Sequence, residues 1–225
     1  MNPARVAGSP DGGPDRAAAL RNYRALAAGY DDSCKYILDI RAMAIHLLQL
    51  RPGEVVFDVA CGTGATLPTL SSLVGPAGRV IGIEQSPEMV AIARTRAAKT
   101  PNANIEVIES PVEDAALAHR ADALLFCYTH DVLQNPRALV NLFAAAKPGA
   151  RVAVTGVRYV SWWLAPVNLW TCWRARHYLS TFRGLSHPWT PLRAYCPDLT
   201  VVRTYHAGTS YLATGRTAGE KRLAA

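Results

Sequence analysis

Several features that define other classes of protein are missing from this 225-residue sequence. No uncharged apolar run approaches the ~20 residues that a membrane-spanning helix needs, and the first residues lack the basic-then-apolar pattern of a secretory signal. The five cysteines are scattered and form no C-x-x-C pair, which argues against a disulfide framework or a zinc site. The sequence therefore predicts a cytoplasmic protein with reduced thiols and no metal.

Acidic residues are absent between Asp131 and Asp198, although the chain contains 17 of them. The same interval holds all five tryptophans. Its basic residues are Arg137, Lys147, Arg151, Arg158, Arg174, Arg176, Arg183 and Arg193. The formal net charge of +7 is therefore concentrated in the C-terminal half, and such an asymmetry bears on partners rather than on fold.

Apolar runs and helix-like segments alternate along the middle of the chain, which is typical of a parallel sheet with right-handed crossovers. The expected strands are residues 54–60, 79–84, 104–109, 121–128, 151–155, 199–206 and 210–214. The expected helices are 16–28, one capped near Asp32 or Ser33, 65–73, one that starts at Pro87 after the N-cap Ser86, 136–146 and 188–194. The last two strands are joined by so short a turn that they must pair antiparallel.

This length suffices for one α/β domain with a full core. We expect that domain to span residues 16–216, after a disordered lead-in over 1–15 that is rich in Pro, Gly and small residues. Residues 217–225 are expected to be a tail.

The stretch 55–64 is an apolar run that ends in Asp-x-Ala-Cys-Gly-Thr-Gly. A Gly-x-Gly turn at the end of a buried strand lets a ligand approach the backbone. Glu84 stands twenty residues past Gly64, at the end of the next apolar run, where an acidic side chain accepts hydrogen bonds from a ribose. This pair predicts an adenosine-containing cofactor. Leu67 occupies the third small position of the dinucleotide fingerprint, so no pyrophosphate is expected.

The glycine motif resembles motif I of the class I S-adenosylmethionine-dependent methyltransferases. The segment 85–89, Gln-Ser-Pro-Glu-Met, resembles the acid-x-Ser-Pro-x-Met segment that follows their second strand. The resemblance covers most of residues 23–216. It implies a Rossmann-like, seven-stranded and mostly parallel sheet with helices on both faces and an antiparallel last strand. The C-terminal half is also similar, more loosely, to bacterial relatives of betaine-lipid and phosphatidylethanolamine N-methyltransferases.

The same resemblance implies which residues contact S-adenosylmethionine. Asp58, Ala60, Gly62 and Gly64 are expected around the methionine moiety, and Glu84 at the ribose. The other residues expected at the cofactor are Tyr23, Tyr30, Gln85, Met89, Ser110, Pro111, Val112 and Cys127. An aromatic ring near a sulfonium is favourable because its quadrupole attracts the positive charge. Tyr23 and Tyr30 also fit a packing stripe, and Met89 also fits the core.

Three residues are the candidates for catalysis: Asp31, Tyr128 and His130. The last two follow the fourth strand, where the resemblance places the sulfonium opposite the acceptor. Asp31 fits either a site for a substrate amine or the start of a helix, and His130 fits either a base or a helix cap. The transfer needs mainly alignment, and it needs a base only when the nucleophile carries a proton.

Missing patterns narrow the acceptor. Residues 135–137, Asn-Pro-Arg, are not the Asn-Pro-Pro-aromatic motif of adenine N6 methylation, and Cys196 lacks the preceding proline of a cytosine C5 nucleophile. The acidic cluster of the magnesium-dependent catechol enzymes is absent too. These absences favour a metal-free methyltransferase that acts on a small molecule or lipid headgroup, with an amine as the expected acceptor group.

Residues 158–187 are expected to form a Trp- and Arg-rich cap over the acceptor site, because they follow the fifth strand on the cofactor's side. This cap has three interpretations: a packed lid, an aromatic cage for a cationic amine with help from Tyr178, or a surface that contacts an anionic membrane.

Two other hypotheses about function remain. One keeps the cofactor but cleaves its aminocarboxypropyl–sulfur bond, by transfer or cyclisation, and releases methylthioadenosine. The other is a non-catalytic module or a basic protein that docks on nucleic acid. The intact glycine loop and Glu84 argue against loss of the cofactor site. Docking on nucleic acid would show as an affinity that falls steeply with salt, and nucleic acid is not an expected partner. The sequence does not specify the oligomeric state.

Overall fold

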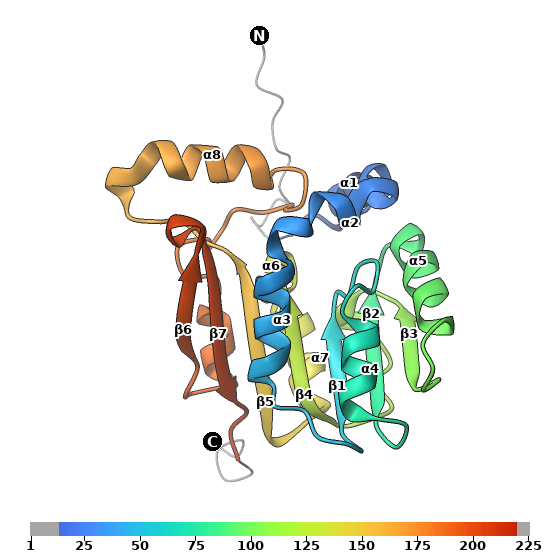
Figure 1. Ribbon diagram of the computed structural model, residues 1–225. Helices are drawn as coiled ribbons and strands as arrows, with labels where there is room; N and C mark the ends of the chain where they lie inside the picture. The colour runs from blue at the N-terminus through green and yellow to red at the C-terminus, as the bar shows by residue number, and fades with distance from the viewer. Residues whose placement is uncertain (1–13, 220–225) are drawn as a thin grey trace.

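Seven strands form one mixed sheet in the order β3-β2-β1-β4-β5-β7-β6 (Figure 1). The computed structural model describes residues 14–219, so residues 1–13 of the expected lead-in and 220–225 of the expected tail lie outside the described residues. Asp15, which was expected in the disordered lead-in, is instead the N-cap of the first helix, because its side chain accepts the N–H of Ala18. The strands are β1 Val55–Val59, β2 Arg79–Glu84, β3 Ile105–Glu109, β4 Ala121–Cys127, β5 Ala146–Val157, β6 Thr200–Tyr205 and β7 Ser210–Arg216. The sheet confirms the predicted Rossmann-like α/β class.

Strands β1 to β5 pair parallel with one another, and β7 pairs antiparallel with both β5 and β6. This confirms the antiparallel last strand. The order of the strands in the sheet reverses between the neighbours β1 and β4. After β1 the chain adds β2 and β3 toward one edge, and from β4 it adds the later strands toward the other edge. In open α/β sheets, ligands bind beside the carboxyl ends of the strands at such a reversal.

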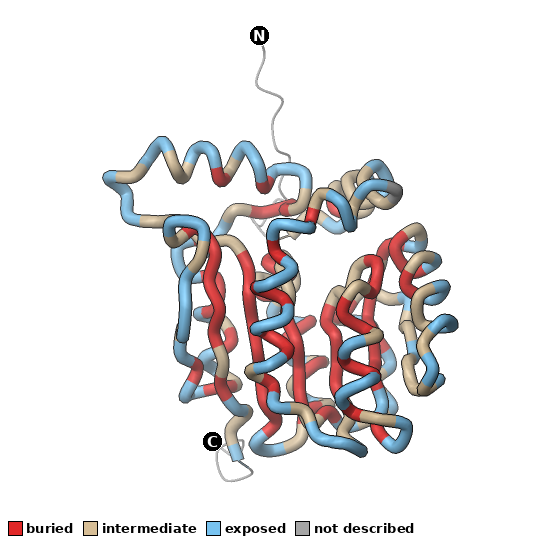
Figure 2. Tube along the Cα trace, in the orientation of Figure 1, coloured by how far each residue is buried: buried red, intermediate tan, exposed pale blue. Residues whose placement is uncertain are grey.

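The helices are α1 Arg16–Leu26, α2 Tyr30–Ser33, α3 Leu38–Leu47, α4 Leu67–Val74, α5 Pro87–Ala98, α6 His130–Leu133, α7 Pro136–Ala144 and α8 Ala165–Ala175. One face of the sheet packs against α3, α4 and α5 through Ala44, Leu48, Leu70 and Ala93. The other face packs against α7 and the 3₁₀ turn Thr190–Ala194. Figure 2 shows the central strands buried and the outer sides of the helices exposed. The two apolar layers hold the strand ends, and therefore the site, in place.

Three local expectations were wrong in detail. The second helix does not begin at a cap near Asp32 or Ser33, because those residues belong to the short helix α2 and α3 starts only at Leu38. The helix expected to reach residue 146 ends at Ala144, because Ala146 already pairs with Ala121 in the sheet.

Third, the short helix expected at residues 188–194 is the 3₁₀ turn Thr190–Ala194. The Trp-rich segment, for which no element was expected, contains the 11-residue helix α8. With α1 and α2, α8 lies beyond the carboxyl ends of the strands, at the top of Figure 1. By contrast, Ser86 caps α5 as predicted, since its Oγ accepts the N–H of Met89.

Candidate functional site

The loop between β1 and α4 turns through residues in the left-handed region, Ala60 at φ 51°, Gly62 at φ 57° and Gly64 at φ 72°. The two glycines serve different purposes. A Cβ on Gly62 would meet only the Tyr30 ring, at 3.7 Å. A Cβ on Gly64 would lie 2.6 Å from a methyl group of Leu67 and about 3.1 Å from the Cβ of Ala93. Gly64 therefore allows α4 and α5 to approach the loop, whereas Gly62 faces the cleft.

Glu84 ties this loop to the end of β2. One carboxylate oxygen accepts the Gly62 N–H at 2.9 Å, and the other accepts the N–H groups of Gln85 and Ser86 at 2.8 and 2.9 Å. Burial raises the pKa of Glu84, and these backbone donors partly offset the rise. A carboxylate has about four acceptor sites, and three are used here, so Glu84 can still accept a hydroxyl group from a ligand.

A cleft at the strand ends contains two small cavities of about 70 and about 50 Å³, which share Ala60, Glu84 and Gln85. The cofactor residues predicted from the sequence that line them are Tyr23, Tyr30, Ala60, Gly62, Glu84, Gln85, Val112 and Cys127. The first cavity runs toward Val112 and the second toward Cys127, so the cleft reaches from the β2–β3 side of the sheet to β4.

Five other residues predicted at the cofactor lie behind the cleft and line none of these cavities: Asp58, Gly64, Met89, Ser110 and Pro111. Asp58 is buried within β1 and accepts a hydrogen bond from Thr66. Burial raises the pKa of Asp58 to about 6, although Thr66 and the charge of Arg41 act against the rise. Met89 is buried too, which matches its interpretation as a core residue.

A larger cavity of about 280 Å³ adjoins the cleft under α8. Its walls are largely aromatic: Tyr23, Tyr30, Tyr36, Tyr128, Trp170 and Tyr178. Four of these residues, Tyr23, Tyr30, Tyr128 and Tyr178, also line the smaller cavity of the cleft, so the two spaces share a wall. Among the described residues, no carboxylate lines the larger cavity, and Arg174 is a cationic group in its wall.

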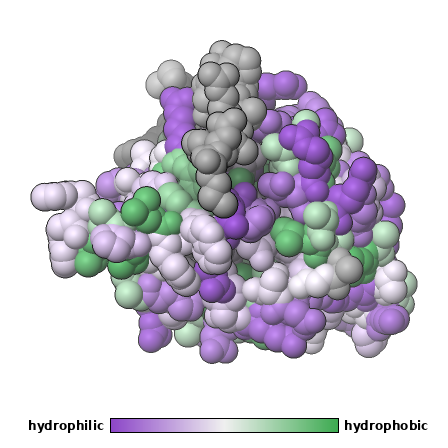
Figure 3. All heavy atoms as spheres, turned by 90° about the horizontal axis from the view of Figure 1, so that it is seen from above, coloured by the Kyte–Doolittle hydropathy of each residue, from purple (hydrophilic) through white to green (hydrophobic). Residues whose placement is uncertain are grey.

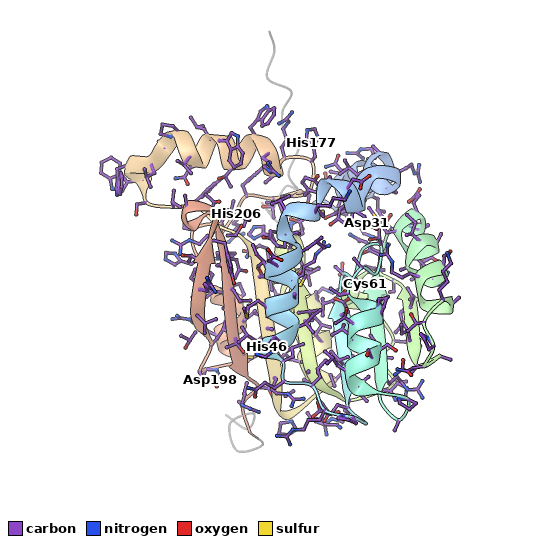
Figure 4. All side chains as sticks on the ribbon, in the orientation of Figure 1. Asp31, His46, Cys61, His177, Asp198 and His206 are labelled. Carbon is purple, nitrogen blue, oxygen red and sulfur yellow. The ribbon has the colours of Figure 1, made fainter. Side chains whose placement is uncertain are left out.

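Tyr128 begins a chain of hydrogen bonds that leads out of this cavity. It sits just after β4 with φ 58°, an unusual conformation for a bulky residue and typical of functional sites. Its hydroxyl donates to the Ser210 Oγ at 3.3 Å, and that oxygen lies 3.2 Å from the Nδ1 of His206. Ser210 is buried and His206 is exposed. Figure 4 places His206 at the β6–β7 turn, below α8.

His130 also lines both the cleft and the larger cavity. Its Nε2 lies 3.0 Å from the Arg183 carbonyl oxygen, so Nε2 carries the proton and Nδ1 keeps a lone pair. Within residues 14–219, that buried Nδ1 has no hydrogen-bond partner. Burial lowers the pKa of His130 to about 4, so the ring is neutral at ordinary pH. The neutral ring of His130, whose Nδ1 is an unused hydrogen-bond acceptor, is suited to bind a hydrogen-bond donor of a ligand.

Asp31 is not placed for the role that the sequence suggested. Its carboxylate pairs with the Arg96 guanidinium at 2.6 Å and accepts the Thr63 hydroxyl at 2.5 Å, outside the three cavities (Figure 4). Burial alone would raise its pKa, but the hydrogen bonds from Thr63 and Arg96 leave that pKa below the usual value. Asp31 therefore joins the N-terminal segment to the glycine loop and α5.

Two charged residues at the site were missed. Asp131 lines the cleft, and one of its oxygens accepts the N–H and Oγ–H of Ser180. Arg41 in α3 is buried beside Tyr30, Cys127 and Asp58, and its Nε has no hydrogen-bond partner in the described part of the chain. The sequence could have indicated Arg41, because a charged residue there interrupts the apolar stripe of helix α3.

Residues 50–177 match the family model described as a methyltransferase domain, which is more than half of the chain. The chain belongs to this methyltransferase-domain family. The resemblance to class I S-adenosylmethionine-dependent methyltransferases is thereby confirmed, and S-adenosylmethionine is the cofactor of the family. The looser similarity to betaine-lipid enzymes stays a prediction.

Two curated relatives and one solved structure illustrate the family. A 2-phytyl-1,4-naphtoquinone methyltransferase of Nostoc sp. is 32% identical over 51% of this chain and 51% of its own length. An arsenite methyltransferase of Halobacterium salinarum is 29% identical over 48% of this chain and 28% of its own. The N-methyltransferase NodS of Bradyrhizobium japonicum, in complex with S-adenosylhomocysteine, has a TM-score of 0.62 at 17% identity, over 89% of this chain and 98% of that one. The chain thus spans about half or less of the length of these two curated relatives. The likeness to the solved N-methyltransferase supports the fold alone.

The residues at the cleft fit this cofactor. The remaining acceptor site of Glu84 suits a ribose hydroxyl, and the unpaired Nε of Arg41 suits the carboxylate of the amino-acid arm. The aromatic rings of Tyr23 and Tyr30 suit the sulfonium. In the described conformation, however, both cleft cavities are small, because α1 and α2 lie close against the loop.

Proposed function

We propose that this protein is an S-adenosylmethionine-dependent methyltransferase whose acceptor is a lipophilic, ring-bearing small molecule without a positive charge. The observation that carries this proposal is the aromatic cavity of about 280 Å³, which shares its wall with the cofactor cleft. A ring held there lies next to the position where the methyl group is expected. The relative named for a naphtoquinone supports an acceptor with a ring system.

The charges around the cavity argue against the cationic amine expected from the sequence. The guanidinium of Arg174 lies 4.2 Å from the ring centre of Tyr36 and 5.3 Å from that of Trp170, both of which line the cavity. The faces of the Tyr36 and Trp170 rings are therefore already occupied by the Arg174 guanidinium, and its positive charge would repel a cationic acceptor. A neutral ring, or one with a hydroxylate oxygen, is compatible with Arg174.

The chain's own residues would align the acceptor and remove its proton. When bound, S-adenosylmethionine would supply an electrophilic methyl group, and the electron pair of the sulfur–methyl bond would stay on sulfur. An acceptor hydroxyl would take this methyl group on its oxygen, and its proton would pass to the Tyr128 oxygen. The Tyr128 proton then passes to Ser210, and the Ser210 proton to His206 Nδ1, which opens to solvent. Burial raises the pKa of Tyr128, so its phenol relays protons and does not act as a free base.

The test is incubation of the purified protein with S-adenosylmethionine and separate pools of ring alcohols, quinols and cationic amines, followed by mass spectrometry. We expect S-adenosylhomocysteine and a methylated product with a ring acceptor. A methylated amine as the sole product would refute the acceptor class. Methylthioadenosine formed without any acceptor would refute methyl transfer and favour aminocarboxypropyl chemistry, to which the family match lends no support.

A further inference from the structure

Helix α8 is apolar on both of its sides. Its inner side contributes Thr171 and Ala175, which are buried over the large cavity. Its outer side presents Pro166, Leu169 and Trp173 at the spacing of a helical face. A helix that is hydrophobic all round normally has a covering on both sides. The described residues cover only the inner side, so the outer side is available for a partner.

The exposure of this outer side is extreme for large apolar residues. Trp162 is 86% exposed, Trp163 67%, Leu169 70% and Trp173 63%. These four residues, which we call the tryptophan stripe, lie within twelve positions of the chain. In Figure 3 the surface over α8, on the left, is mostly pale or green rather than deep purple. Such a concentrated exposed patch marks an interaction site.

The surroundings of the tryptophan stripe carry positive charge. Arg174, Arg176 and Arg183 are exposed here, and no acidic residue occurs between positions 131 and 198. The Arg176 guanidinium lies 4.7 Å from the ring centre of Trp173, so ring and cation face the same partner. Arginine pairs with phosphate through two hydrogen bonds, and tryptophan favours the boundary between headgroups and acyl chains.

From this combination we propose that α8 docks the protein on the surface of a membrane that contains anionic lipids. The segment combines exposed tryptophan rings, which suit the headgroup layer, with arginines and no acidic residue of its own, and both properties favour an anionic lipid surface. The helix has 11 residues and is about 16 Å long, which is too short to span ~30 Å of hydrocarbon. Within residues 14–219, no helix is long and apolar enough to cross a bilayer. The helix would therefore lie in the plane of the membrane surface.

The large cavity lies directly beneath this docking surface. Trp170 and Arg174 of α8 line the cavity and are also exposed. A lipophilic molecule that leaves the membrane at α8 therefore has a short route to the cavity. This route rests on the proposed function, but the docking itself does not depend on which group is transferred.

The test is sedimentation of the full chain with vesicles of phosphatidylcholine alone or mixed with phosphatidylglycerol, at low and high salt. We expect binding to the anionic vesicles, weakened by salt because the charges are exposed. Combining Trp162→Ser, Trp163→Ser and Trp173→Ser should weaken binding on the order of a hundredfold, since binding follows the apolar area removed from water. Arg176→Gln and Arg183→Gln should each weaken it about fivefold.

The matched control is the pair Val140→Ser and Val202→Ser, which removes exposed apolar side chains away from α8 and should leave binding unchanged. Affinity for S-adenosylhomocysteine should stay constant in every variant, because none of these residues lines the cleft. Three results would overturn the proposal: no binding to anionic vesicles, equal loss in the control, or a dimer that the tryptophan variant dissociates. A membrane-bound protein that transfers no methyl group would instead count against the proposed function alone.

Discussion

Replacing Gly64 by alanine tests whether this glycine is required by packing or only by its backbone angle. Gly64 has φ 72°, where an alanine costs about 1–2 kcal/mol. The new Cβ would also approach a methyl group of Leu67 to 2.6 Å and the Cα of Ala93 to 3.2 Å. Both neighbours are buried, so the clash should add about 1–3 kcal/mol. We expect Gly64→Ala to lower the free energy of unfolding by about 2–5 kcal/mol.

The chain offers a matched control at Gly149, which has φ 73° and no heavy atom within 4 Å of the position of a Cβ. Gly149→Ala therefore carries only the backbone strain, about 1–2 kcal/mol. Urea unfolding of the cofactor-free protein, with unchanged m-values, measures both losses. If the two variants lost the same stability, Gly64 would be required only for its backbone angle, and the packing argument would be refuted.

Three further substitutions address charge and proton transfer. Arg41→Met should lower the free energy of unfolding of the cofactor-free protein by about 1 kcal/mol, because the surroundings of Arg41 raise its pKa and so favour its charge in the folded state. It should also weaken the binding of S-adenosylhomocysteine about tenfold or more in a thermal-shift titration, and an unchanged affinity would contradict the partner assigned to its unpaired Nε. Because the pKa of Asp58 is raised to about 6, the folded protein binds this proton more tightly than the unfolded chain. The free energy of unfolding should therefore fall by roughly 2–3 kcal/mol as the pH rises from about 4 to about 6. Asp58→Asn still accepts from Thr66 and should abolish that fall in urea unfolding, and a persistent fall would assign it to another group. With a hydroxyl-bearing acceptor, His206→Gln should lower kcat about a hundredfold and leave cofactor affinity intact; an unchanged kcat would exclude the relay.

The parts of the fold that depend on local chemistry could be predicted from the sequence. The strand expected at residues 79–84 has those bounds, because a short apolar run between turn residues has few alternatives. Ser86 was identified as a cap because its side chain and the following Pro87 act within one helical turn. Helix α8 was not expected, because Leu169 and Trp173 are exposed and break the pattern of a helix with one buried face.

The arrangement of the site depends on contacts between distant parts of the chain, which a single sequence does not reveal. Asp31 meets Arg96, 65 positions away, and its carboxylate is therefore engaged in a pair instead of facing the cavity. Tyr128 meets Ser210 across 82 positions, so the relay becomes visible only when β4 and β7 are placed beside β5. The glycine loop and Glu84 were accessible because their spacing follows from a single strand–helix–strand unit.

The ion pair between Asp31 and Arg96 also bears on the order of events during turnover. It holds the segment with Tyr23 and Tyr30 against the glycine loop, and the cleft beneath is too small to admit a nucleoside. Both partners are partly exposed, so the pair contributes no more than about 1 kcal/mol and breaks readily. The N-terminal segment thus acts as a weak latch. Under the proposed function, the cofactor would enter and its spent form would leave while this latch is open.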